Sequence, residues 1–66
     1  MDPNEYETTV EDLERDLDVE VNSLLSKALN ASTNGPSAQA AQAWEDLAIQ
    51  FDRMAETSRR VAEGLR

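Results

Sequence analysis

The chain has no cysteine and no histidine, and its 66 residues include only two glycines, two prolines and three aromatic side chains. Without cysteine, neither a disulfide nor a thiolate metal site can stabilise the fold. The missing histidine removes the usual proton shuttle at neutral pH and the commonest metal ligand. Two glycines are too few for a phosphate-binding loop, and no nucleotide-binding motif is present. We therefore expect a non-enzymatic protein with no catalytic residue and no cofactor.

The second feature is an excess of negative charge, which gives a formal net charge of −8. Residues 1–33 contain nine acidic and two basic residues, whereas residues 34–66 contain five acidic and four basic residues. Such a field repels phosphate backbones and anionic membrane surfaces, so we expect no nucleic-acid partner. The acidic half is interpreted either as a solvated helix face or as a surface that steers a basic partner toward the chain.

Long apolar runs are also missing. No segment approaches the roughly 20 apolar residues that a membrane-spanning helix needs. The N-terminal residues are acidic and lack the basic and then apolar order of a secretory signal. We therefore expect a cytoplasmic location and no membrane span.

The second half of the chain carries a heptad-like apolar pattern. Its steps alternate between three and four residues, and only a serine interrupts it: Trp44, Leu47, Phe51, Met54, Ser58, Val61 and Leu65. This spacing places all seven side chains on one helix face and is typical of a helix that packs against another helix. Ser37 is a suitable N-cap, and several alanines follow it. The pattern predicts a helix from about residue 38 to 64.

A similar stripe precedes it in the acidic half. Its members are Tyr6, Val10, Leu13, Leu17, Val21, Leu24 and Ala28. The segment Asp2-Pro3-Asn4-Glu5 has the form of a capping box with proline at the first helical position. Thr8, followed by Glu11 three residues later, is a second possible start. Because the stripe already includes Tyr6, we favour the earlier start and predict a helix from about residue 3 to 31.

Between the two stripes lies the turn signal Asn34-Gly35-Pro36-Ser37. The sequence therefore predicts an all-α fold: one antiparallel two-helix hairpin with coiled-coil-like packing, spanning residues 1–66, with a turn at about 32–37. Folding back at this turn places Leu24 opposite Trp44 and Val21 opposite Leu47. A chain of this length is near the lower limit for a self-sufficient core. We expect another subunit to contribute stability.

One alternative role for the carboxylates is a metal site. Asp12, Asp16 and Glu20 are spaced four residues apart on one helix face. The run from Asp16 resembles the start of an EF-hand loop, but Val21 occupies the sixth position, where that loop needs glycine. We therefore predict a solvated acidic face and no metal. The serines have no histidine to activate them, which argues against nucleophilic catalysis.

Some apolar residues do not fit a two-helix core. Ile49 lies about 200° around the helix from Leu47, and one opposing helix is too narrow to cover the wide apolar face near the turn. A contiguous patch of such residues marks a protein interface. The predicted partner-binding residues are Leu25, Leu29, Trp44, Ile49, Phe51, Val61 and Leu65. Self-association is the competing interpretation.

Several positions over about residues 24–66 carry a likeness to a known family. They are Leu25 and Lys27 in the first helix, Gly35 in the turn, Gln42 and Trp44 at the start of the second helix, and Val61, Ala62, Leu65 and Arg66 at its end. With these residues the chain resembles the E-type co-chaperones of the bacterial type III secretion needle subunit (the YscE/PscE group). It departs from the family pattern at Ala41, where we expect an aromatic residue, and in its larger negative charge.

The resemblance implies a small bacterial cytoplasmic co-chaperone in a virulence-associated protein transport system. Such a protein binds and stabilises a larger chaperone built from tetratricopeptide-like (TPR-like) helix pairs. The larger chaperone keeps the needle subunit monomeric before export, in a 1:1:1 complex. Two alternatives remain: a needle-like structural subunit of the secretion apparatus, and an acidic helical regulator that forms a four-helix bundle by dimerising. A homodimer of the isolated chain is a further alternative.

Overall fold

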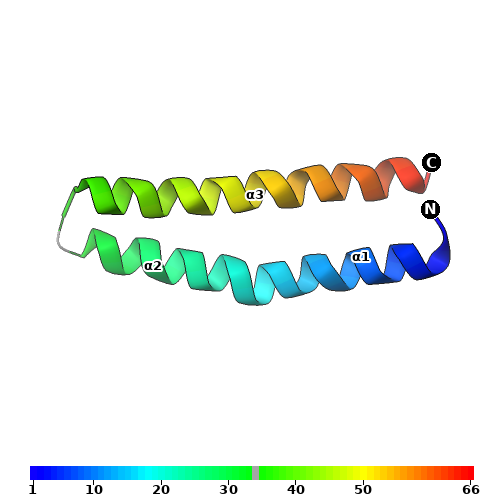
Figure 1. Cartoon of the computed structure of the whole chain (residues 1–66), viewed down its shortest axis with the longest axis horizontal. Coiled ribbons are helices and arrows are strands. Elements are labelled where there is room, and N and C mark those ends of the chain that lie inside the picture. The colour runs from blue at the N-terminus through cyan, green and yellow to red at the C-terminus, as the bar shows by residue number, and fades with distance from the viewer. Residues whose placement is uncertain (34) are drawn as a thin grey trace.

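The computed structural model describes residues 1–33 and 35–66 and shows a helical hairpin, which confirms the predicted all-α fold (Figure 1). Helix α1 (Pro3–Arg15), the π-helical segment η1 (Asp16–Val21) and helix α2 (Asn22–Ser32) form one continuous rod, called helix one below. Helix α3 (Ala38–Gly64) runs back alongside it, so that both chain ends lie at the same end of the molecule (Figure 1). Asn34, the first residue of the predicted turn signal, lies outside the described residues.

Both helix starts are fixed by side-chain caps. The Asp2 carboxylate accepts a hydrogen bond from the Glu5 backbone N–H at 2.8 Å, and Pro3 follows the cap directly. The earlier of the two predicted starts is thus confirmed. Ser37 Oγ accepts a hydrogen bond from the Ala40 backbone N–H at 3.0 Å and caps α3 in the same way. Each cap satisfies a backbone donor that has no partner within its helix.

The π-helical segment η1 explains an irregularity in the stripe of helix one. From Leu13 to Val21 the chain advances eight residues, which in an α-helix is about 80° more than two full turns. A π-helical turn holds one more residue than an α-helical turn, and it therefore removes this excess rotation. Val21 is buried and Leu13 half-buried along the same contact line, whereas Leu17 between them is 53% exposed. The π turn thus aligns the two ends of helix one against α3 and leaves Leu17 facing solvent.

The core lies near the turn and is formed by Val21 and Ala28 of helix one and by Ala40 and Leu47 of α3. Val21 and Leu47, expected to face each other, are thus both buried. Along α3 the contact line with helix one follows a three-four spacing: Ala40, Ala43, Leu47, Gln50, Met54, Thr57 and Val61. We call these seven residues the seam.

The seam corrects one sequence-based expectation. Leu47, Met54 and Val61 belong to it as predicted, but Trp44, Phe51, Ser58 and Leu65 are exposed. A single neighbouring helix contacts α3 along one line only, so it covers one edge of the apolar stripe and leaves the other edge open. The small side chains of the seam near the turn, such as Ala40 and Ala43, let helix one approach on the covered edge.

The resulting molecule is thin and elongated. Its principal extents are 47 × 17 × 10 Å, and its radius of gyration is 15.0 Å. A compact chain of the same length has a radius of gyration of about 11 Å. The shortest extent equals the diameter of a single helix. A layer this thin leaves apolar side chains exposed on its flanks, where a second protein could bind.

Candidate functional site: an open apolar face

The uncovered edge of α3 is a row of uncharged side chains. The residue that follows each of the seam positions 40, 47, 54 and 61 is an exposed alanine. Larger residues lie four positions after the seam positions 40, 47 and 61: Trp44 (41% exposed), Phe51 (48%) and Leu65 (63%). The complete row is Ala41, Trp44, Ala48, Phe51, Ala55, Ser58, Ala62 and Leu65, and every member is exposed. We call it the α3 row.

Helix one contributes apolar side chains to the same flank. Leu29 follows the buried Ala28 by one residue, and Leu17 follows Leu13 by four. In two antiparallel helices, the residues one or four positions after a contact residue lie on the same flank of the pair. Seen along one common direction, the sequence advances clockwise in one helix and counterclockwise in the other, and the two contact lines face each other. Tyr6 shares a groove on this side of α1 with Glu14, which directly follows Leu13. The large exposed side chains of this flank, called the open face below, are Tyr6, Leu17, Leu29, Trp44, Phe51 and Leu65.

Among the described residues, Trp44 is the one member of the open face that is held by a hydrogen bond between the two helices. Its indole Nε1 donates to Ser32 Oγ at 2.9 Å, and Ser32 Oγ donates to the Ala28 carbonyl oxygen at 2.8 Å. The ring therefore reaches two helical turns closer to the chain reversal than Leu24, its expected neighbour. It borders a hollow lined by Ser32, Gly35, Pro36, Ser37, Ala40 and Ala41. A rigid, partly exposed aromatic ring of this kind is typical of interface anchors.

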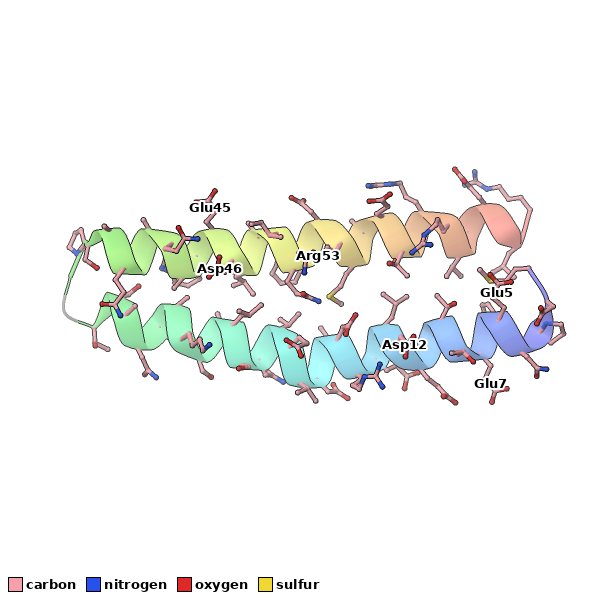
Figure 2. The ribbon with its side chains drawn as sticks, in the orientation of Figure 1. Glu5, Glu7, Asp12, Glu45, Asp46 and Arg53 are labelled. Atoms are coloured by element: carbon pink, nitrogen blue, oxygen red, sulfur yellow. The ribbon has the colours of Figure 1, made fainter. Side chains whose placement is uncertain are left out.

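The opposite flank, called the polar flank, has a different composition. The residue that precedes each of the seam positions 40, 47, 54 and 61 is polar: Gln39, Asp46, Arg53 and Arg60. Grooves on this flank are lined by Lys27, Asn30 and Gln42 near the turn and by Glu20 and Gln50 further along. Figure 2 shows Asp46 and Arg53 turned toward the space between the helices, and Glu45 pointing away from helix one. Apolar contact surface is thus concentrated on one side of the hairpin.

This geometry separates the predicted partner-binding residues. Leu29, Trp44, Phe51 and Leu65 lie on the open face, while Leu25 and Val61 are half-buried at its edge. Ile49 is exposed on the polar flank, where it shares a groove with Glu20 and Arg53. Sequence reasoning missed Tyr6 and Leu17, which it assigned to the hairpin core. The two successive steps of four on either side of Leu17 were the available signal.

Charged residues border the open face on both helices. On α1, the groove that contains Tyr6 is also lined by Glu7, Glu11 and Glu14. On α3, the residues just outside the α3 row are spaced seven apart, first two acids and then two bases: Glu45, Asp52, Arg59 and Arg66. The one ion pair found in the described parts of the chain joins Arg15 to Asp12 within α1, at 2.8 Å. In those parts, therefore, no ion pair links helix one to α3.

The described residues form neither a metal site nor a membrane-spanning helix. Among residues 1–33 and 35–66, no three acidic, histidine or cysteine side chains converge as a metal-binding group would require. Within the same residues, no helix combines the length and the apolarity needed to cross a lipid bilayer. The open face is thus the main feature on which a functional proposal can be built.

No family model, curated protein or solved structure matches this chain significantly. The resemblance to the E-type co-chaperones therefore stays a prediction that rests on the residues named above.

Proposed function

We propose that the chain is a non-enzymatic binding protein that packs its open face against a larger helical protein. In its specific form, the proposal is a bacterial cytoplasmic co-chaperone of the type III secretion needle subunit. The observation that carries the proposal is the open face itself, in which six large apolar side chains are exposed on one flank. Large apolar side chains gathered on one exposed flank are typical of interaction sites.

The α3 row favours a helical partner. Its period of 3.5 residues matches the spacing at which two helices interlock their side chains. An alanine recurs at every seventh position, from Ala41 to Ala62, and leaves room for large side chains of a neighbouring helix. The repeating unit of TPR-like chaperones is a pair of antiparallel helices. Such a pair would cover both α3 and helix one and form two packed layers of two helices each.

In the proposed complex, the larger chaperone holds the polymerising helix of the needle subunit, and this chain stabilises the larger chaperone from another side. The resemblance implies a 1:1:1 complex, and one open face per copy is compatible with one copy per larger chaperone. The charged outer surface supports solubility of the assembly, because a net charge of −8 opposes aggregation.

The proposal is tested by affinity purification from native cytosol with mass spectrometry. The double variant Trp44→Ala and Phe51→Ala removes two exposed anchors, and the matched control Val19→Ala and Ile49→Ala removes two exposed apolar residues elsewhere. The wild type and the control should recover a helical-repeat chaperone together with a needle-type subunit, whereas the anchor variant should recover neither. Circular dichroism verifies that all three proteins keep their helical content. Equal recovery by the anchor variant, or a wild type that recovers no helical-repeat chaperone, would overturn the proposal.

A further inference from the structure

The open face is also complementary to itself. We propose that, when the larger partner is absent, two copies of the chain cover each other's open faces and form a four-helix bundle. Helix one of each copy then packs on α3 of the other, around a two-fold axis parallel to the helices. This dimer goes beyond the proposed function, because it uses the same surface for a second occupant and would compete with the chaperone for it.

The apolar side chains of the two helices match along the hairpin. Residues of helix one and α3 lie at the same level when their numbers add up to about 70: Glu20 shares a groove with Gln50, and Lys27 shares another with Ala43. By this register, the open face consists of three levels, which are Leu29 with Trp44, Leu17 with Phe51, and Tyr6 with Leu65. A rotation about an axis parallel to the helices leaves the height of each residue along that axis unchanged. The dimer therefore stacks three apolar layers, each with the same two residues from both copies.

The hairpin also exposes more surface to solvent than a compact protein of its mass. The hairpin exposes 5003 Å², whereas a compact protein of the same mass exposes about 4,200 Å². The excess is about 800 Å², which equals the area that each partner contributes to an interface of standard size. Burial of one flank by a second copy would thus bring the chain to the surface area that its mass predicts.

The charge distribution favours a two-fold axis parallel to the helices. A two-fold axis perpendicular to the helices would place helix one on helix one, with Glu14 of one copy near Asp18 of the other. Residues 1–33, which contain nine acidic and two basic residues, would then face their own copy, and such like-charge contact is unfavourable. The parallel axis instead places helix one on α3, whose charges nearly balance.

The charged borders of the open face fit this arrangement. By the register of the hairpin, Glu11 comes level with Arg59 of the second copy, and Glu7 comes near Arg66 of the second copy. Glu14 lies within one helical turn of the same Arg59. One like-charge contact remains, between Asp18 and Asp52 of the second copy. Most of these contacts therefore join opposite charges, and the two-fold symmetry of the interface forms each of them twice.

Sedimentation equilibrium of the purified chain tests the dimer. At about 100 µM, well above a micromolar Kd, the wild type should sediment as a dimer. Leu17→Glu places a charge in the central layer and should weaken self-association by about 100-fold or more. It should leave the helical content unchanged, because Leu17 is exposed in the hairpin. Val19→Glu makes the same kind of change at an exposed residue on another face and should remain dimeric. A monomeric wild type, or equal weakening by the two variants, would overturn the inference.

Cysteine cross-linking tests the axis, since the chain has no cysteine of its own. Two single variants, Leu17→Cys and Phe51→Cys, are purified separately, mixed and oxidised. The parallel axis predicts a disulfide between the two different variants. The perpendicular axis predicts that Leu17→Cys pairs with itself, and that result, or the lack of any cross-link, would overturn the proposed geometry.

These tests are independent of the proposed function. A monomeric wild type that still recovers the chaperone would refute the dimer alone. A dimeric wild type that recovers no chaperone would refute the co-chaperone proposal alone.

Discussion

The half of the hairpin next to the turn differs from the half that carries the chain ends. The turn half, residues 21–47, contains the four buried residues Val21, Ala28, Ala40 and Leu47. Among residues 1–20 and 48–66, all of which the structure describes, none is buried. Only three of the chain's twenty charged residues lie in the turn half: Lys27, Glu45 and Asp46. The turn half is thus an apolar folding unit, and the end half is a charged extension of it.

The comparison indicates where the stability of the hairpin comes from. The hydrogen bond from Trp44 to Ser32 and the short connection between the helices also belong to the turn half. In the end half, acidic side chains crowd α1, and the apolar residues that face α3 are at most half-buried. Regions with few buried contacts open first. We therefore expect the end half to fray in the free monomer and to become ordered when a second protein covers the open face.

The largest expected effect comes from deleting one residue at the boundary between the halves. Deletion of Ile49 rotates the end half of α3 by about 100° relative to the turn half and removes Met54 and Val61 from the seam. We expect a loss of about 3 kcal/mol, because the half-buried seam residues from Gln50 onward lose their contact with helix one. Circular dichroism should show that the turn half still unfolds cooperatively.

The matched deletion of Val19 should be tolerated. Both residues are exposed and apolar, but Val19 lies within η1, where the π turn holds one extra residue. Its removal allows a regular α-helix and leaves Leu13 and Val21 seven residues apart, still on one face. We expect a change within about 1 kcal/mol. Equal damage by the two deletions would show that the π turn does not serve to align the halves.

A smaller effect is expected from shortening one seam side chain in each half. Leu47→Ala opens a cavity at a buried position and should destabilise the hairpin by about 2–3 kcal/mol. Val61→Ala removes a side chain that is only half-buried and should cost about 1 kcal/mol or less. Urea denaturation of both variants measures the difference. A larger loss from Val61→Ala would contradict the assignment of the core to the turn half.

The sequence predicts some of these features because they depend on local chemistry. The caps at Asp2 and Ser37, the chain reversal and the two amphipathic stripes follow from residues close together in the chain. Which edge of a stripe becomes the contact line depends instead on the neighbouring helix. Trp44, Phe51 and Leu65 have the same spacing as the seam residues, and sequence periodicity does not distinguish the covered edge from the open one.

The π turn is a second feature that local patterns do not specify. Two successive steps of four are compatible with a continuous α-helix whose apolar stripe drifts gradually around its surface. Only contact with α3 determines that the extra residue is accommodated in one turn and that Leu17 turns outward. Four of the seven predicted partner-binding residues lie on the open face in the structure, and Tyr6 and Leu17, which also lie there, were assigned to the hairpin core by sequence reasoning.

The two glycines provide a further comparison between the halves. Gly35, next to the turn half, has a φ of +91° and no atom within 4 Å of the position a Cβ would take. Gly35→Ala should therefore cost about 1–2 kcal/mol through backbone strain alone. Gly64, in the end half, is helical, and a Cβ there would meet the side chain of the terminal Met1. That contact is with the Met1 Cβ at 2.9 Å, so the first residue has to shift, and this cost should offset the gain in helix propensity and leave Gly64→Ala about neutral. Thermal unfolding would detect both effects, and equal destabilisation would contradict the prediction.

Small effects are also expected at the two N-caps, and they compare the halves most directly. Ser37→Ala and Asp2→Ala each remove a side-chain acceptor for a first-turn backbone N–H, a change of about 1 kcal/mol at either helix. The loss at Ser37 should lower the global stability by that amount, because α3 begins beside the buried Ala40. The loss at Asp2 should instead appear as faster hydrogen exchange in the first turns of α1 with an almost unchanged Tm, since those turns fray before the hairpin unfolds. If Asp2→Ala lowers the Tm as much as Ser37→Ala does, the end half unfolds together with the turn half, and the expected division of the hairpin is wrong.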